Sequence, residues 1–346
     1  MPEQSGPSDG MWSVDHPVLD ALRERRRAKS QPGQRADDHK IGLAVEGGGM
    51  RGVVSGAMLA ALEEFGFGSA FDALYGCSGG AINSAYFVAG EAWRALPIYF
   101  QDLPSRDFLR LGRFLRGGSA LDLAVVFDEI MEQVRPLHYD RVLSSPVPLT
   151  VALTMVDTIQ PYAATDFTTR EDLKAALMST SWRPVLVRGA GVYRGERAID
   201  GSVLTSLPYR MAVDDNCTHV LSLSTFPAGS YQARPSPFIR LTARHVERLR
   251  KGLGAAYLAE VARKHSDLQR LARLRHEPGA ERPYVLDLAP MAGQPTLARW
   301  ELRPRPLLAA ITSAYEMVYA AVEGLPSSTI GTGAFTALPR WTVVRP

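Results

Sequence analysis

Two units of the same pattern follow each other in the first third of the chain. Residues 41–45 form a short apolar run that ends in a glycine cluster, and residues 55–65 then place apolar side chains at helical spacing. Residues 71–75 are typical of a second strand, residues 76–80 of a sharp turn, and residues 81–89 of a helix rich in small side chains. The pattern therefore predicts strand, tight loop and helix, twice in succession.

The alternation of strands and helices continues further along the chain. Residues 147–155 are apolar and rich in β-branched side chains, and residues 220–224 form another apolar run. Residues 169–178 lie between them and have helical spacing. Alternation of this kind is typical of a mostly parallel sheet covered by helices, so the predicted fold class is α/β.

The segment before residue 40 differs in character from the rest of the chain. It is polar and charged, with one expected helix over residues 18–29 and a polar stretch containing proline and glycine after it. We expect a flexible leader over residues 1–39 and a single α/β domain over residues 40–346. Its core motifs fall within residues 40–225, and residues 239–325 are expected to be mainly helical.

A basic segment lies in the second half of the chain. Residues 240–275 carry many arginines and an apolar stripe, and they are predicted to form two helices broken near residues 252–254. One interpretation is a solvated surface helix pair whose stripe packs on the core. The other is a basic face that meets anionic lipid headgroups as a peripheral membrane contact. The sequence leaves both open.

Charge and cysteine content exclude several classes of protein. The chain of 346 residues has 39 Lys and Arg against 36 Asp and Glu, a net charge of only +3, and no basic stretch interleaved with aromatics, so nucleic acid is not expected as a partner. Only Cys77 and Cys217 occur, which argues against a disulfide scaffold. No cluster with metal-ligand spacing is present, and neither a metal nor another cofactor is expected.

Targeting signals are also missing from the sequence. The first 40 residues lack the apolar run of roughly 7 to 15 residues that a secretory signal needs. No apolar stretch approaches the roughly 18 to 20 residues required to cross a bilayer. We therefore expect a cytoplasmic protein whose membrane contact, if any, is peripheral.

The strongest chemical motif is Gly76-Cys77-Ser78-Gly79-Gly80. It fits the Gly-x-Ser-x-Gly nucleophile elbow and lies where that motif works, at the exit of a strand and the entry of a helix. The glycines let the chain reverse sharply, which exposes the Ser78 hydroxyl at the positive end of the helix dipole. Ser78 is therefore the candidate nucleophile.

A glycine-rich loop, Glu46-Gly47-Gly48-Gly49-Met50-Arg51-Gly52, lies one unit upstream. Backbone N–H groups in such a loop can bind the phosphate of a nucleotide or the oxyanion of an acyl-transfer intermediate. Gly47, Gly49 and Gly52 match the dinucleotide-binding spacing, but no acidic ribose-binding residue is evident at the end of the next strand. The loop is not a Walker nucleotide-binding loop, because no Gly-Lys-Ser/Thr follows.

A serine nucleophile needs a base. None of the seven histidines lies in a glycine or aspartate motif, and His219 alone is placed near a strand. Asp200-Gly201 is a better candidate, because it follows a polar loop and the glycine suits a turn that presents the carboxylate beside Ser78. An ordinary Asp-Gly β-turn is the alternative interpretation.

Together the three motifs resemble the patatin-like phospholipase family, whose signature is Gly-Gly-Gly-x-Arg-Gly, then Gly-x-Ser-x-Gly, then Asp-Gly-Gly/Ala. The resemblance covers roughly residues 40–224 and implies a three-layer fold and a Ser78–Asp200 dyad without histidine. It also implies an oxyanion hole built by backbone N–H groups of Gly48, Gly49 and Met50. The matching motif positions that would support this site are Gly47, Arg51, Gly52, Gly76, Gly80 and Gly201. Ser202 departs from the family, which usually has glycine or alanine there.

What the resemblance implies in function is a serine lipid acyl hydrolase, a phospholipase A or lysophospholipase-like esterase that works through an acyl-enzyme. Two rivals remain: an α/β-hydrolase esterase that uses Ser78, Asp200 and His219, and a non-catalytic lipid- or nucleotide-binding module. Arg51 is expected either to hold the loop in shape or to neutralise a lipid phosphate. The sequence specifies neither the lipid class nor the oligomeric state.

Overall fold

One sheet organises the molecule. The computed structural model describes residues 11–333 apart from 107, 111, 114–115, 228–235 and 291–296. These residues form an eight-stranded sheet in which β5, β6, β3, β2, β1, β7 and β8 follow one another and β4 pairs with β3. The strands are β1 (Ile41–Val45), β2 (Ala73–Gly76), β3 (Leu149–Met155), β4 (Gln160–Ala164), β5 (Gly191–Tyr193), β6 (Glu196–Asp200), β7 (His219–Leu223) and β8 (Tyr284–Leu288).

The centre of the sheet is parallel and one side of it is antiparallel. Strands β3, β2, β1, β7 and β8 pair in parallel, whereas β4 and β6 pair antiparallel with β3, and β5 with β6. The parallel strands β1, β2, β3 and β7 are buried along their whole length, as expected for strands covered on both faces. This confirms the predicted α/β class with a mostly parallel sheet.

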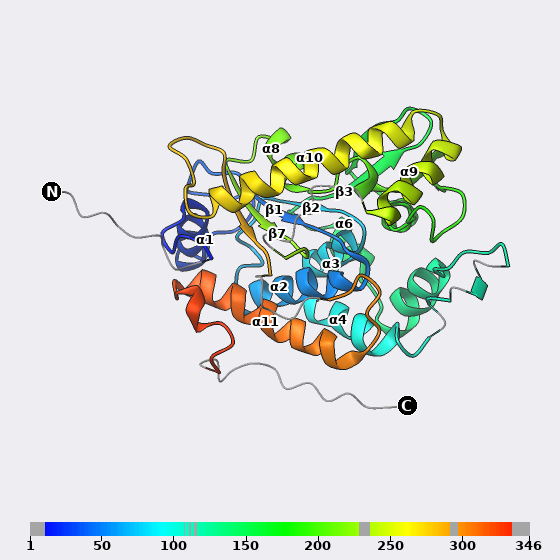
Figure 1. Cartoon of the computed structure of the whole chain (residues 1–346). Helices are drawn as coiled ribbons and strands as arrows, with labels where there is room; N and C mark the ends of the chain where they lie inside the picture. Colours follow the sequence, from blue (N-terminus) through cyan, green and yellow to red (C-terminus); the bar gives the residue numbers. More distant parts are fainter. Residues whose placement is uncertain are drawn as a thin grey trace.

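Helices cover both faces of the sheet (Figure 1). Along β1, Leu43 and Val45 belong to the large core that contains α2, α3 and α11, whereas Ala44 belongs to a second core with α8 and α10. This alternation is what a strand between two helical layers requires. The helices are α1 (Pro17–Arg27), α2 (Gly52–Glu64), α3 (Gly79–Val88), α4 (Ala92–Pro97), α6 (Tyr139–Leu143), α7 (Arg170–Thr180), α8 (Tyr209–Asp214), α9 (Pro237–Leu249), α10 (Leu253–Leu274) and α11 (Pro304–Glu323).

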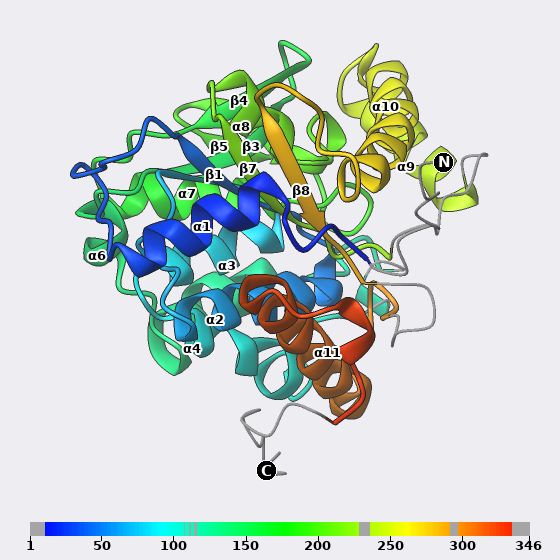
Figure 2. The same cartoon turned by 90° about the vertical axis from the view of Figure 1, so that its left-hand side faces the viewer.

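Shorter helical turns complete the architecture. Gly49–Arg51, Gly201–Val203 and Ser327–Thr329 are 3-10 turns, and Ile98–Asp102 and Val125–Val134 are π-helical. Figure 2 shows α2 and α11 lying side by side on one face of the sheet. The predicted break in the basic segment is present, since α9 ends and α10 begins on either side of Gly252, which has a φ of 95°.

The segment before residue 40 differs from the flexible leader predicted for residues 1–39. From residue 11 on it packs against the body, with Trp12 and Leu19 in the core and Arg25 2% exposed. His16 caps α1 through its Nδ1, which accepts a hydrogen bond from Val18 N at 3.2 Å. The apolar side of α1, which the sequence pattern showed only as a helix, is therefore part of the core.

The longest helices of the described residues are α10 and α11. Neither these nor any other described helix combines the length and the apolar character that crossing a bilayer demands. Most apolar side chains of α11 lie in the large core, and Leu253, Tyr257, Leu268 and Leu271 of α10 lie in smaller buried clusters.

Candidate functional site

Ser78 sits at the sharp turn between β2 and α3. Its φ of 54° and ψ of −134° are strained for a residue with a side chain, and α3 begins at the next residue. A Cβ at Gly80 would lie 2.4 Å from the carbonyl oxygen of Val45, so only glycine lets α3 approach β1 so closely. Residues 76–80 therefore form a sharp, strained turn from strand to helix, which we call the elbow.

A threonine on α7 holds the turn in place. The backbone N–H of Ser78 donates to Thr180 Oγ1 at 2.9 Å, and that hydroxyl donates to the Ala152 carbonyl on β3 at 2.6 Å. Thr180 is fully buried. The turn is thereby connected to the strand that also positions Asp200.

The glycine loop packs directly on the elbow. A Cβ at Gly47 would lie 2.4 Å from the Cys77 carbonyl oxygen and 2.7 Å from Ser78 Cβ, so a side chain there would push the two apart. Among the described residues, the N–H of Gly48 has no hydrogen-bond partner. The N–H of Met50 is engaged, because it donates to the Arg299 carbonyl at 3.0 Å.

Asp200 reaches the elbow because of the sheet topology. Leu153 of β3 pairs with Tyr162 of β4 on one edge and with Asp200 on the other, while Val151 pairs with β4 and with Gly76 of β2. Strands β2 and β6 therefore meet end to end along the same edge of β3. The last residue of β6 comes to lie beside the residues that follow β2.

The Asp200 carboxylate is 1% exposed and is held by three groups. Its Oδ1 accepts from Ser202 N at 2.8 Å and from the Cys77 thiol at 3.8 Å, and its Oδ2 accepts from Arg183 Nη1 at 3.4 Å. Arg183 Nη1 also donates to Ser202 Oγ at 2.6 Å. The serine that departs from the family pattern thus supports the arginine beside the carboxylate.

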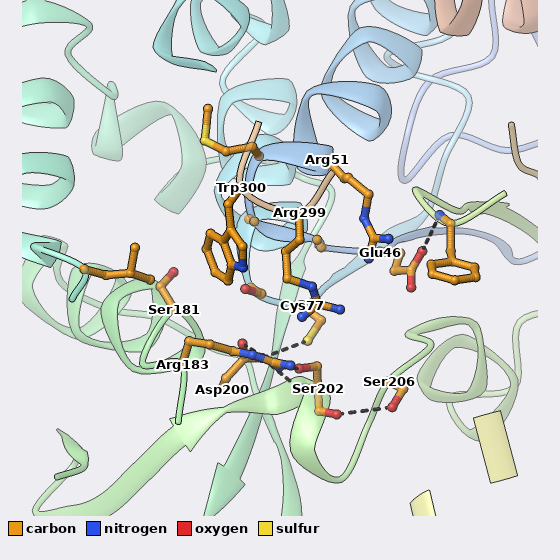
Figure 3. A pocket seen from close by; sticks show the side chains of 18 of the residues that line it. Glu46, Arg51, Cys77, Ser181, Arg183, Asp200, Ser202, Ser206, Arg299 and Trp300 are labelled. Carbon is orange, nitrogen blue, oxygen red and sulfur yellow. Dashed lines mark hydrogen bonds and ion pairs between the residues drawn. The ribbon is translucent and has the colours of Figure 1, made fainter. Parts of the chain in front are cut away.

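Ser78 and Asp200 line one cavity of about 750 Å³. No hydrogen bond between their side chains occurs in the described part of the chain. Figure 3 shows Asp200, Cys77 and Arg183 gathered at one side of this cavity. The structure therefore brings the two predicted residues to one site.

Most of the cavity wall is apolar. Side chains from the stretch between Ile98 and Phe127 line one part of the cavity, and side chains of α9 and α10 line another. The first group includes Ile98, Leu103, Phe108, Leu121 and Phe127, and the second includes Phe238, Ile239, Leu258 and Val261. A wall of this kind suits an acyl chain, because burying its methylenes is favourable by about 0.8 kcal/mol each.

Glu46 ties three elements together at the start of the glycine loop. Its Oε1 lies 2.5 Å from Lys264 Nζ on α10, and its Oε2 accepts from the N–H of Thr225 at 2.7 Å. Burial favours a higher pKa for Glu46, but Lys264 and Arg51 hold that pKa below its ordinary value. Glu46 is therefore a charged, fully paired support of the loop.

Two further arginines of the cavity have no motif in the sequence to mark them. Arg183 follows α7, and Arg299 lies before α11, far along the chain from the other site residues. Burial, with Arg183 and Arg51 nearby, lowers the pKa of Arg299. Only the proximity created by folding identifies these residues as part of the site.

His219 lies at the opposite end of the sheet. It begins β7 and pairs in register with Ile41, whereas the glycine loop follows Val45 at the other end of β1. Its ring packs against those of His39, at 4.4 Å between centroids, and Tyr284, at 5.3 Å. A strand of five residues spans roughly 13 to 17 Å, so His219 is out of reach of Ser78 in this structure.

A strained serine, a glycine loop and a buried aspartate thus lie together at one edge of a helix-covered sheet. A sequence model of the family described as patatin-like phospholipase matches residues 43–213. The chain therefore contains a domain of this family, and the family supports lipid acyl hydrolysis as its general activity.

Two individual proteins are similar to the chain. An Escherichia coli (strain K12) protein named YjjU, described as uncharacterized, is 26% identical over 196 residues, which are 56% of this chain and 54% of that relative. The match thus spans about half of the relative's length. A crystal structure of VipD from Legionella pneumophila superposes on 93% of this chain and 72% of its own, with 12% identity and a TM-score of 0.47.

Proposed function

We propose that the protein is a serine lipid acyl hydrolase of the phospholipase A or lysophospholipase type, with Ser78 as nucleophile and Asp200 as base. The observation that carries the proposal is the meeting of a strained serine and a buried carboxylate in one apolar cavity. The order of the three motifs and the match to the family support the same assignment.

The reaction divides into two steps. Ser78 Oγ attacks the ester carbonyl while its proton passes to the Asp200 carboxylate, and collapse of the tetrahedral intermediate expels the alcohol, which takes that proton. The acyl group is then bound to Ser78. Water attacks this acyl-enzyme, again giving a proton to Asp200, and the fatty acid leaves as Ser78 recovers the proton.

The oxyanion of each intermediate would be bound by the N–H groups of Gly48, Gly49 and Met50. One such donor contributes about 3 to 4 kcal/mol to lowering the barrier. Because the Met50 N–H donates to the Arg299 carbonyl in this structure, it can serve only after that carbonyl moves away. Gly48 already has its N–H unpaired among the described residues.

Access from a membrane surface is proposed through α9 and α10. Leu241 is 49% exposed and Leu258 is 40% exposed, and Leu258 also lines the cavity. Arg240 and Arg244 are exposed on the same helix as Leu241. Exposed apolar side chains with flanking cations suit a peripheral contact with anionic lipid.

Two other functions are weaker. The esterase with a catalytic histidine needs His219 near Ser78, and these residues lie at opposite ends of the sheet. A binding module with an inert serine does not account for the strained conformation of Ser78 beside a buried carboxylate, since such strain is usually retained for a function.

The proposal is tested by measuring fatty-acid release from mixed vesicles of phospholipid and glyceride by mass spectrometry. Wild type is expected to release fatty acid and Ser78→Ala is expected to release none. Ser84→Ala is the matched control, because Ser84 is buried on α3, which Ser78 caps, and among the described residues its hydroxyl donates only to the Gly80 carbonyl. Equal release by wild type and Ser78→Ala would overturn the proposal.

A further inference from the structure

The charges that line the cavity do not balance. The described lining residues include four cations, Arg51, Arg183, Lys264 and Arg299, and two carboxylates, Glu46 and Asp200. Both carboxylates are already engaged, Glu46 with Lys264 and Asp200 with Arg183. Counted in this way, four positive charges against two negative ones leave an excess of two.

The excess resides in guanidinium groups that lack acceptors. The Arg51 side chain makes no hydrogen bond or ion pair within the described residues; its Nε is buried and unbonded, and its guanidinium carbon lies 4.9 Å from the centre of the Phe226 ring. Arg299 likewise donates no side-chain hydrogen bond to a described residue. The Nε of Arg183 is buried and unbonded as well.

Three separate segments bring these arginines together. Arg51 lies in the glycine loop, Arg183 follows α7, and Arg299 precedes α11. Figure 3 shows all three side chains around the same part of the cavity, next to Cys77 and Asp200. Burial lowers the pKa of Arg51 and of Arg299, and the neighbouring guanidinium of Arg183 lowers both further.

Such an arrangement is costly in an empty site. Arg51 is buried and Arg183 and Arg299 are half-buried, so removing these cations from water without a full set of partners is unfavourable, and three like charges in one cavity repel each other. A bound anion removes both costs, because guanidinium groups form short, charge-assisted and often bidentate hydrogen bonds with phosphate oxygens. The unpaired groups therefore have the chemistry of a phosphate site.

We propose that Arg51, Arg183 and Arg299 form a subsite for the phosphate monoester headgroup of the lipid substrate, and thereby select anionic lipids of the phosphatidate or lysophosphatidate kind. This inference rests on the proposed function, since it names the substrate class of the same cavity. A phosphate monoester carries a charge of about −1.5 to −2 near pH 7, which matches the excess of two positive charges.

A choline headgroup fits less well. Its quaternary ammonium would be repelled by the three guanidinium groups, and both lining carboxylates already have cationic partners. A neutral glyceride would leave the three guanidinium groups without an acceptor. The expected order of preference is lysophosphatidate, then lysophosphatidylcholine, then monoacylglycerol of the same acyl chain.

Binding can be measured without catalysis. Calorimetric titration with short-chain ether analogues, an alkyl glycerophosphate and the matching alkyl glycerol, reports the phosphate contribution because the analogues lack an ester. Wild type is expected to bind the phosphate analogue more tightly by at least about 10-fold. Arg299→Gln and Arg51→Gln are each expected to lower this selectivity by about 10-fold.

The control is Arg141→Gln, because the Arg141 side chain is 60% exposed and lies outside the cavity. It is expected to keep the wild-type selectivity, and thermal unfolding verifies the fold of every variant. Equal binding of the two analogues by wild type, or an unchanged selectivity in both Arg299→Gln and Arg51→Gln, would overturn the subsite.

Two further arms separate the possible sources of phosphate and the two proposals. Inorganic phosphate that binds as tightly as the alkyl glycerophosphate would assign the site to free phosphate and overturn the lipid headgroup. The same variants are then assayed for release of fatty acid from lysophosphatidate and monoacylglycerol. Selective binding without any turnover would support the subsite and count against the proposed hydrolase. Turnover without a headgroup preference would support the hydrolase and count against the subsite.

Discussion

The two ends of the sheet both contain buried arginines, but they use them differently. At the amino end, Arg25 donates five hydrogen bonds, to the carboxylates of Asp37 and Asp72 and to the carbonyls of Ala70 and His39, at 2.7 to 2.9 Å. At the carboxyl end, the Arg51 side chain has no hydrogen bond within the described residues. The buried guanidinium at the amino end has a full set of acceptors, whereas the one at the carboxyl end has none among the described residues.

This difference separates structural from functional charge. A fully bonded guanidinium such as Arg25 joins α1, β1 and β2 and needs nothing more. An unbonded one such as Arg299 contributes nothing comparable to the fold and is poised for a ligand. Mutations of arginines at the amino end are therefore expected to lower the stability of the fold, and mutations of arginines at the carboxyl end to lower activity and ligand binding.

The largest effect is expected for the carboxyl end. Asp200→Asn keeps the shape of the side chain but removes the base, so fatty-acid release is expected to fall by at least about 10³-fold, as in Ser78→Ala. Stopped or continuous assays on a lipid ester would measure this. Asn at position 200 with more than a tenth of wild-type activity would rule out the dyad.

Replacing Arg25 is expected to cost more unfolding free energy than replacing Arg299. Arg25→Met leaves Asp37 without its buried partner and Asp72 with Arg35 alone, and breaking a buried pair costs about 3 to 5 kcal/mol of unfolding free energy. Arg299→Met removes a cation that lacks a hydrogen bond, so its unfolding free energy is expected to stay within about 1 kcal/mol of wild type. Urea unfolding of both variants measures this, and equal losses would contradict the distinction.

A pH effect is expected at the amino end. Burial, together with the positive neighbours His39 and Arg282, lowers the pKa of His219 from 6.5 to about 4. As the pH falls from about 6.5 to about 4, the unfolded chain takes up this proton first, so stability is lost in that window and is fully present above it.

His219→Gln is therefore expected to lose less stability than wild type between pH 7 and pH 4.5, as measured by urea unfolding at each pH. His16, whose pKa burial also lowers to about 4, is expected to leave part of the acid sensitivity in the variant. The same variant is expected to hydrolyse lipid at pH 8 at a rate close to that of wild type. A near-complete loss of hydrolysis would instead favour the alternative function, an esterase that uses His219 as its base.

The smallest effect is expected on membrane contact. Leu241→Glu replaces the exposed leucine of α9 by a negative charge, and binding of the variant to anionic vesicles is expected to weaken a few-fold in sedimentation. Val192→Glu is the matched control, because Val192 is 63% exposed on β5 and does not line the cavity. Equal weakening in both variants would show a general effect of charge.

Much of the fold could be predicted because its central units have strong local signals. The glycine motifs mark the two turns, and apolar runs mark β1, β3 and β7 within a few residues of their observed bounds. The antiparallel β4, β5 and β6 were not anticipated as strands, because β4 is largely exposed and β5 has only three residues. Short, polar strands depend on their partners rather than on their own pattern.

Only the residues of the site that belong to a sequence motif could be predicted. Ser78, the glycine loop and Asp200 were predicted to meet, and the structure brings them to one cavity. Arg183 and Arg299 were not, because their importance arises from tertiary proximity between distant segments. The engagement of the Met50 N–H by the Arg299 carbonyl also depends on a contact between residues far apart in the chain.

Covalent labelling tests the central claim most directly. Wild type, Ser78→Ala and Asp200→Asn are treated with a fluorophosphonate and analysed by intact-protein and peptide mass spectrometry. The account predicts one adduct on Ser78 in wild type, slower labelling in Asp200→Asn and none in Ser78→Ala. An adduct on another residue, or equal labelling of wild type and Ser78→Ala, would contradict it.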